Sequence, residues 1–158
     1  VFAGFSVGTW PLWGDGRVLA VSGADGAVLY EERFDEHWGV ASPLAVDLDG
    51  DNHHEVLFQV NHIVTGQLTR IMGSIHSVVD FPEGERREVL RVEGVSYGTA
   101  RVVDLDDDGW LEFVFSHALS GRWTMEARTL DARVPSLGSW DEYMGPGGRG
   151  IFSPQRAP

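Results

Sequence analysis

The sequence contains no cysteine and no lysine among its 158 residues. The missing cysteine excludes disulfides, thiolate metal sites and cysteine nucleophiles, although it does not fix the compartment. All twelve basic residues are arginine, which we interpret as coding bias rather than as a mechanism. No run approaches eighteen apolar residues, so we expect no membrane span.

Positive charge is scarce as well, because the chain has 24 acidic residues and only 12 basic ones, which gives a net charge of −12. This balance argues against nucleic acid or an anionic membrane surface as the main partner, since both reward clustered positive charge. It is compatible with cation binding. The length favours one domain. The chain begins with Val1 and shows no basic-then-apolar leader, so we expect a processed form or a piece of something longer.

The most informative feature that is present is an internal repeat. Residues 44–58, LAVDLDGDNHHEVLF, align without gaps on residues 101–115, RVVDLDDDGWLEFVF. Both segments place D-L-D-x-D-x-x-x-E between apolar residues. A third, weakened copy, PLWGDGRVLAVSG at residues 11–23, keeps only Asp15 of the acidic positions, so we expect no metal there.

Outside the acidic loops the pattern is typical of strands. Residues 17–21 and 27–33 flank Asp25-Gly26, and Asp-Gly between apolar runs is a strong hairpin signal. Short segments rich in β-formers predict four further strands, over residues 68–75, 77–81, 88–92 and 123–130. No window shows a sustained apolar face with helical period, so we expect a nearly all-β fold.

The spacing of the acidic loops suits Ca²⁺, which takes about six to eight oxygen ligands. The first loop offers Asp47, Asp49, Asp51, the carbonyl of His53, and Glu55. The second loop offers Asp104, Asp106, Asp108, the carbonyl of Trp110, and Glu112. Gly50 and Gly109 permit the positive φ that a tight turn requires. We expect Leu48 and Leu105 to point inward and to anchor the loops.

Two alternatives to calcium loops are weaker. An EF-hand needs a carboxylate at position 12 and flanking helices, whereas position 12 is Phe58 or Phe115 and the flanks resemble strands. The loops could also be polar turns that hold nothing. Two copies in register, each with four carboxylates, favour two Ca²⁺ sites over that interpretation, and Mg²⁺ seldom uses cages made of protein ligands alone.

The segments DLDGDNHHEVLF and DLDDDGWLEFVF resemble the Ca²⁺-binding loops of FG-GAP/VCBS repeats, found in integrin α-subunit propellers and in many secreted bacterial proteins. Residues 4–23 resemble a degenerate opening of the same repeat, and residues 22–34 are similar to its outer hairpin. In the first loop Asn52 replaces the usual glycine, so it must adopt a backbone near the left-handed region. In the second loop Asp107 adds a fifth carboxylate.

The resemblance implies antiparallel β-propeller-type blades in one domain over residues 1–144, with repeats near 4–40, 41–97 and 98–144, followed by a Gly/Pro-rich extension at 145–158. About three blades, the first degenerate, cannot close a ring. We therefore expect an incomplete propeller, an open β-stack or an assembly completed by oligomerisation. The expected partners are further copies in a homo-oligomer or filament, or the remainder of a larger propeller.

Candidate enzyme motifs are incomplete. Residues 4–8 match the G-x-S-x-G nucleophile elbow around Ser6, but the sequence that follows cannot start a helix. His54-Glu55 begins like a zinc-protease motif, but its fifth position is Phe58 rather than histidine. We assign no catalytic residue. The six tryptophans could form a carbohydrate-stacking surface, although packing between blades is the favoured interpretation.

These observations predict an extracellular or cell-surface β-repeat module, stabilised by structural calcium and used for adhesion or self-assembly, with a glycan or protein ligand. The alternative is part of a secreted polysaccharide-active enzyme, such as a lyase, because these repeats also occur in that context. Exposed sheet edges and self-association would support the module. A groove with a base, an arginine and stacked aromatics would support the enzyme.

Overall fold

The computed structural model describes residues 1–9, 12–35, 37–65, 70–81, 83–96 and 98–135. The predicted extension at residues 145–158 lies outside these ranges. Within them the chain is all-β, with antiparallel strands and no helix, which confirms the predicted fold class at that level. The strands are β1 (Phe2–Thr9), β2 (Leu12–Val21), β3 (Val28–Phe34), β4 (His37–Val40), β5 (Leu44–Val46), β6 (Glu55–Thr65), β7 (Arg70–Val79), β8 (Arg86–Glu93), β9 (Arg101–Val103), β10 (Trp110–Leu119) and β11 (Arg122–Arg133).

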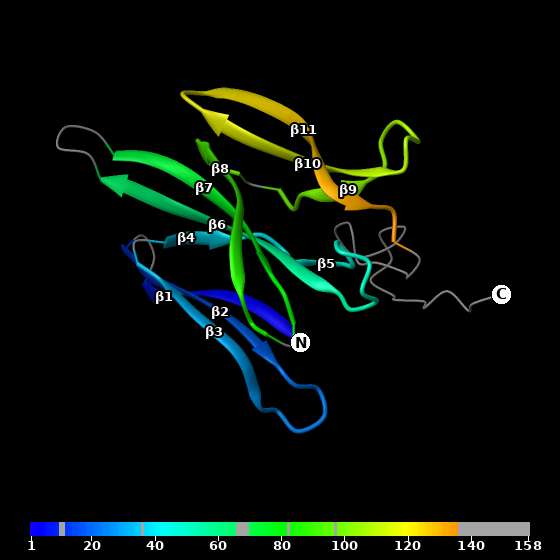
Figure 1. Ribbon diagram of the computed structural model, residues 1–158. Coiled ribbons are helices and arrows are strands. Elements are labelled where there is room, and N and C mark those ends of the chain that lie inside the picture. Colours follow the sequence, from blue (N-terminus) through cyan, green and yellow to red (C-terminus); the bar gives the residue numbers. More distant parts are fainter. Residues whose placement is uncertain (10–11, 36, 66–69, 82, 97, 136–158) are drawn as a thin grey trace.

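The described strands form three sheets, each built from one continuous stretch of chain. The first sheet has the order β1-β2-β3, and the third has the order β9-β10-β11. The middle sheet has the order β4-β6-β7-β8, and the short β5 also pairs with β6. Figure 1 shows the sheets as layers, with the middle sheet between the other two. None of these sheets closes into a ring among the described strands.

The predicted hairpin around Asp25-Gly26 is confirmed, because it joins β2 to β3. Gly26 has a φ of 76°, and its N–H donates to the carbonyl of Ser22 at 3.1 Å. The Asp25 carboxylate accepts a hydrogen bond from the N–H of Ala27 at 3.1 Å. The turn therefore uses both the glycine backbone and the aspartate side chain, as the sequence pattern requires.

The predicted break between strands at residues 68–75 and 77–81 is wrong. β7 runs without interruption from Arg70 to Val79, and the segment 66–69 lies outside the described residues. Its pairing with β8 shifts register between His76 and Ser77, which marks a β-bulge. His76 pairs with Leu90 and Ser77 pairs with Glu88, so the extra residue of the bulge is Val89 of β8, and β7 itself continues through His76.

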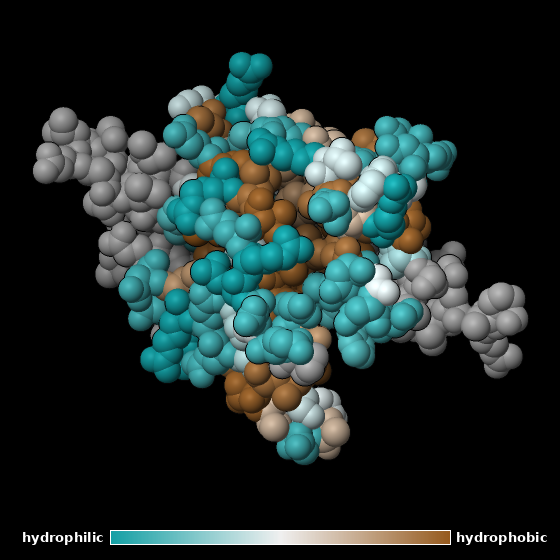
Figure 2. Space-filling view, in the orientation of Figure 1, coloured by the Kyte–Doolittle hydropathy of each residue, from teal (hydrophilic) through white to brown (hydrophobic). Residues whose placement is uncertain are grey.

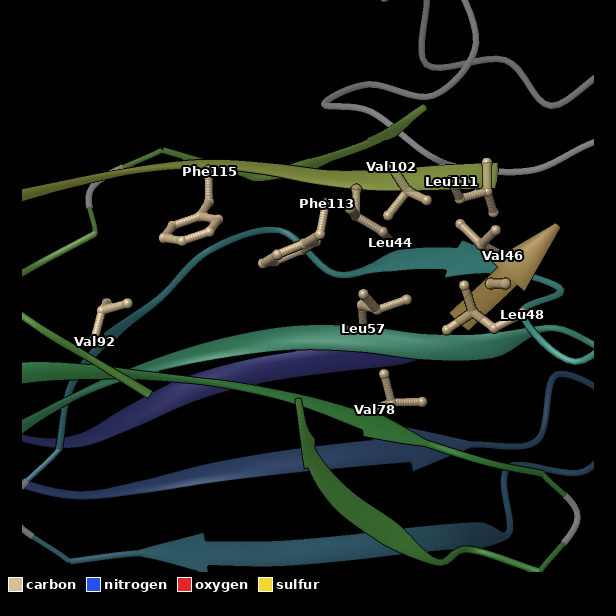
Figure 3. Close-up of a cluster of buried hydrophobic side chains, with 11 residues drawn as sticks. Leu44, Val46, Leu48, Leu57, Val78, Val92, Val102, Leu111, Phe113 and Phe115 are labelled. Atoms are coloured by element: carbon tan, nitrogen blue, oxygen red, sulfur yellow. The ribbon is translucent and has the colours of Figure 1, made fainter. Parts of the chain in front are cut away.

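The larger hydrophobic core lies between the middle and third sheets (Figure 3). Leu57 of β6 and Val78 of β7 share this space with Phe113 and Phe115 of β10. Leu48 also belongs to the cluster, so the first acidic loop is fixed to the core. The buried members are Leu44, Val46, Leu48, Leu57, Val78, Val92, Val102, Leu111, Phe113, Phe115 and Ala132. Burial of each large apolar side chain contributes about 1.5–3 kcal/mol.

A smaller core lies between the first and middle sheets. Phe58 of β6 packs there with Val18 of β2. The Phe58 ring centroid lies 5.5 Å from that of Phe2 and 6.1 Å from that of Phe34. Since its neighbour Leu57 faces the other core, β6 is covered on both faces at this point, where the sequence is Val56-Leu57-Phe58. On the face shown in Figure 2, hydrophilic residues cover much of the described surface and hydrophobic residues gather near the centre.

Polar side chains fill one part of the interior beside the larger core. The side-chain oxygen of Asn61 accepts hydrogen bonds from the Ser74 hydroxyl at 2.6 Å and from the Ser96 N–H at 3.2 Å. The side-chain amides of Asn61 and Gln59 both donate to the Ser96 carbonyl, at 2.9 and 2.8 Å. All four residues are buried, so these bonds hold the segment after β8 in one position.

We expect Gly94→Ala to lower the free energy of unfolding by about 2 kcal/mol or more. Gly94 has a φ of 100°, and a Cβ there would lie 2.5 Å from the carbonyl oxygen of Ala118. That oxygen also accepts a hydrogen bond from the Val95 N–H at 2.9 Å, so it is held in place. Gly23→Ala is the matched control, because a Cβ at Gly23 meets nothing within 4 Å. Urea unfolding that gives equal losses for both variants would contradict the prediction.

We expect the protein to lose stability in mild acid because His76 is buried. Its side chain packs against both Phe113 and Phe115, with ring centroids 5.1 and 5.2 Å away, and it is 2% exposed. Burial, with a smaller contribution from the charge of His117, lowers the pKa of His76 to about 4. The unfolded chain takes up this proton near pH 6.5, so stability is complete above that pH and falls by about 3 kcal/mol toward pH 4. The free energy of unfolding, measured in urea over this pH range, should fall less in His76→Phe than in the unsubstituted protein. An equal fall in both proteins would show that His76 does not cause the loss of stability.

Candidate metal centres

The two acidic loops occupy equivalent places in two hairpins. The first loop (residues 47–55) connects β5 to β6, and the second loop (residues 104–112) connects β9 to β10. In the first hairpin Val46 pairs with Glu55, and in the second Val103 pairs with Glu112. Each loop therefore follows a three-residue strand and leads into a long strand of the core. The repeat seen in the sequence is also a repeat of local structure.

The two loops share a backbone conformation that they reach with different residues. Positive φ occurs at the fourth loop position, at Gly50 (83°) and Asp107 (61°), and at the sixth, at Asn52 (69°) and Gly109 (85°). The predictions for Gly50, Gly109 and Asn52 are confirmed. Asp107 was expected only as an added carboxylate, although its alignment with Gly50 could have revealed its conformation. Aspartate and asparagine tolerate this region better than other side chains do.

The first aspartate of each loop organises the turn. Asp47 accepts hydrogen bonds from the N–H groups of Gly50 at 2.7 Å and Asn52 at 3.2 Å. Asp104 accepts bonds from the N–H groups of Asp108 at 3.1 Å and Gly109 at 2.9 Å. These bonds curl each loop around its first carboxylate, as Asx-type side chains do in turns.

The closing glutamates are buried and point back into their loops. One carboxylate oxygen of Glu55 accepts a hydrogen bond from the Leu48 N–H at 2.5 Å, and one of Glu112 accepts from the Leu105 N–H at 2.8 Å. Glu55 is 4% exposed and Glu112 is 8% exposed. The residue predicted to close each loop at position 9 therefore contacts position 2 of the same loop.

Three carboxylates converge in each loop and could hold a metal ion. In the first loop they belong to Asp47, Asp49 and Glu55, each offering an oxygen within 4.8 Å of the others. In the second loop they belong to Asp104, Asp106 and Asp108, under the same limit. Oxygen donors of this kind suit hard cations such as Ca²⁺. The structure thus supports two possible cation sites and leaves the identity of the metal open.

The Glu55 carboxylate shows that the first site fits a cation. Its second oxygen is buried and has no hydrogen-bond partner among the described residues. Burial raises the pKa of Glu55, and the carboxylates of Asp49, Asp80 and Asp47 raise it further, against the bond from Leu48. An unpaired carboxylate oxygen among like charges is costly, and a bound cation would offset that cost.

The remaining predicted ligands stand apart from the two convergent groups. Asp51 accepts bonds from the His53 N–H at 2.7 Å and contacts its imidazole at 3.2 Å, and the bond from this N–H lowers the pKa of Asp51. Asp108, which does belong to the second convergent set, accepts a bond from the Trp110 N–H at 2.8 Å in the same way. Asp51 and Glu112 do not belong to the sets that converge within 4.8 Å. Ligation by the carbonyls of His53 and Trp110 stays a prediction.

One anchoring prediction is correct and its counterpart is wrong. Leu48 is 7% exposed within the larger core, whereas Leu105 is 62% exposed. The first loop lies against the third sheet, whose Leu111 and Ala132 share the cluster with Leu48. The second loop belongs to the outermost of the described sheets, so no further sheet among these residues covers Leu105.

Two other sequence segments differ from the acidic loops. The weakened third copy forms no loop at Asp15, because residues 12–21 make the single strand β2. Ser6 lies inside β1 opposite Gly16, so the strand-to-helix turn of a nucleophile elbow does not occur there. Asp80 was not among the predicted site residues, yet it lies close enough to Glu55 to raise the pKa of the Glu55 carboxyl. Only the pairing of β6 with β7 brings these two residues together.

Comparison of the chain with models of protein families, with curated proteins and with solved structures finds no match.

We expect metal-free Glu55→Gln to be more stable than the unsubstituted protein by about 1 kcal/mol near pH 7. The amide still accepts the bond from Leu48 but removes the unpaired charge. Since the pKa of Glu55 is raised, its carboxyl takes up a proton as the pH falls toward the ordinary glutamate range, and the difference between the proteins should shrink. Urea unfolding in chelator at about pH 8 and pH 5 measures both effects.

Glu112→Gln is the matched control for this comparison. Glu112 makes the same bond to the position-2 N–H but does not belong to the convergent set in its loop. We expect its substitution to change the stability of the metal-free protein less than Glu55→Gln does. An equal gain from both variants would show that the unpaired oxygen of Glu55 has no special cost.

Proposed function

We propose that the protein is a non-enzymatic β-repeat module whose two acidic loops bind Ca²⁺ in a structural role. The single observation that carries this proposal is the buried, unpartnered oxygen of Glu55, which converges with Asp47 and Asp49. The second loop supports it, because it has the same backbone and its own three convergent carboxylates. Calcium is preferred to softer metals because the convergent donors are carboxylate oxygens and the chain has no cysteine.

The position of the loops supports a structural role for the metal. Each loop joins two paired strands, and the first also inserts Leu48 into the larger core. A cation that neutralises the carboxylates would fix the strand ends and favour the folded state. In our proposal the three layers are blade-like units of an open β-stack or of an incomplete propeller.

We further propose that the module serves adhesion or self-assembly outside the cell. β11 is the last strand of the third sheet among the described strands, and it exposes Trp123 (63%) and Met125 (77%). Edge strands and exposed apolar side chains invite pairing with another chain. Calcium modules outside the cell typically have dissociation constants of about 0.1–1 mM, and the exposed positions of Asp49, Asp106 and Asp108 suit that range. The described residues contain no helix that is apolar and long enough to cross a membrane.

We expect Ca²⁺ to bind with two equivalents per chain and to raise the melting temperature. A site with a dissociation constant of about 0.5 mM contributes about 2 kcal/mol at 10 mM Ca²⁺. Isothermal titration calorimetry and thermal unfolding, each with Ca²⁺ and with chelator, measure these effects. Size-exclusion chromatography with light scattering on the same samples tests self-assembly.

The variants separate the two sites. Glu55→Gln should remove one equivalent of bound Ca²⁺, and Asp106→Asn should weaken the other, because each side chain belongs to one convergent set. Asp131→Asn is the control, since Asp131 is exposed on β11 outside both loops. An unchanged melting temperature with Ca²⁺ would overturn the metal proposal. A monomer in both conditions would overturn self-assembly alone.

A further inference from the structure

A pocket of about 240 Å³ opens beside the first acidic loop, between this loop and the turn that joins β7 to β8. Its lining combines acidic, basic and apolar side chains. The lining residues are Leu48, Asp49, Glu55, Val78, Asp80, Glu85, Arg86 and Arg87. The pocket therefore contains two residues of the first convergent set together with groups from another hairpin.

The acidic side of the pocket is formed by part of the first convergent set, where a bound cation would lie. Asp49 and Glu55 both line the pocket and both belong to the convergent set. Glu55 is 4% exposed, and one of its carboxylate oxygens is buried without a hydrogen-bond partner among the described residues. Asp80 adds a further negative charge from the end of β7. A divalent cation held here would leave coordination positions for water or for a ligand, because Ca²⁺ takes about six to eight oxygens.

The two arginines of the pocket differ in their contacts. Arg86 is engaged, because it forms an ion pair with Glu32 at 2.9 Å and donates to the Ser77 hydroxyl at 3.0 Å. Its guanidinium group also lies 5.6 Å from the ring centroid of Phe34. Arg87 has no hydrogen-bond or ion-pair partner among the described residues. Its guanidinium group is therefore available to a ligand.

The register of β8 explains this difference. Arg86 pairs with Val79, which packs in the smaller core, and Arg87 pairs with Val78, which packs in the larger core. Successive residues of a strand point to opposite faces, so only Arg87 shares a face with Val78 and the first acidic loop. Leu48 and Val78 give the same pocket an apolar floor.

We propose that this pocket binds a carboxylate on a short aliphatic stem, held between the cation of the first acidic loop and the guanidinium group of Arg87. The inference rests on the calcium binding proposed above. A carboxylate supplies oxygens to Ca²⁺ and accepts hydrogen bonds from arginine, while the stem lies against Leu48 and Val78. Binding requires the cation, because the protein carries a net charge of −12 and the pocket wall alone repels anions.

Two sources share this chemistry, namely a free aliphatic acid and a glutamate side chain of an extended peptide. Butyrate is the probe for the first, and acetyl-Gly-Glu-Gly-amide is the probe for the second. Butyramide and the corresponding Gln peptide are the uncharged controls. Tighter binding of the Glu peptide than of butyrate assigns a peptide partner, and equal or weaker binding assigns a small acid.

The test is a titration of each probe into the full chain, either with 10 mM Ca²⁺ or with chelator. Binding is detected by NMR chemical-shift changes in the protein. We expect binding of butyrate or of the Glu peptide only with Ca²⁺, and none of the uncharged controls. Arg87→Gln should weaken binding about tenfold or more, because it removes a charged hydrogen-bond donor. Arg122→Gln should leave binding unchanged, since Arg122 lies at the start of β11, away from the pocket.

Calcium binding is measured separately by calorimetry on the same proteins. Calcium binding that is retained in Arg87→Gln, together with lost carboxylate binding, supports the assignment. Calcium binding by the unsubstituted protein without any response to the carboxylates overturns this inference alone. Carboxylate binding that persists in chelator or in Arg87→Gln also overturns it. Absence of calcium binding overturns both this inference and the proposed function.

Discussion

The burial of β6 on both faces is the constraint on which the rest of the structure depends. Leu57 contributes to the core shared with the third sheet, and Phe58 contributes to the core shared with the first. A strand covered on both sides fixes the order of the layers, because each neighbouring sheet must pack against one of its faces. The first acidic loop enters β6 directly at Glu55. The charge state of that loop is therefore coupled to the position of the central strand.

Each acidic loop combines two requirements that oppose one another in the absence of metal. The backbone needs carboxylates as hydrogen-bond acceptors, since Asp47 and Asp104 each bind two N–H groups. The same carboxylates repel one another when they are drawn within 4.8 Å. Hydrogen bonds stabilise the loop shape without removing the net charge. A cation held among these carboxylates would remove the repulsion and leave the hydrogen bonds of the loop intact.

Local patterns in the sequence predicted local structure well and contacts between layers poorly. The Asp25-Gly26 hairpin and the positive φ of Asn52 follow from turn chemistry within a few residues. The inward position of Leu48 and the exposure of Leu105 depend instead on which sheet covers each loop, and the loop sequences hold no such information. Asp80 reaches the first site only through the pairing of β6 with β7. The buried polar cluster around Asn61 likewise requires the segment after β8, which is distant in sequence.

Leu48 is buried and Leu105 is exposed, so the two acidic loops differ in how strongly their opening is coupled to unfolding of the core. Leu48 ties the first loop to a cluster that includes members of both the middle and third sheets. Opening of that loop would withdraw a core side chain, so its amide protons should exchange with solvent through large, costly fluctuations. Leu105 makes no such link, and the second loop can open as a small local unit. Opening of the first loop would thus loosen the packing between the middle and third sheets, whereas opening of the second loop would stay local.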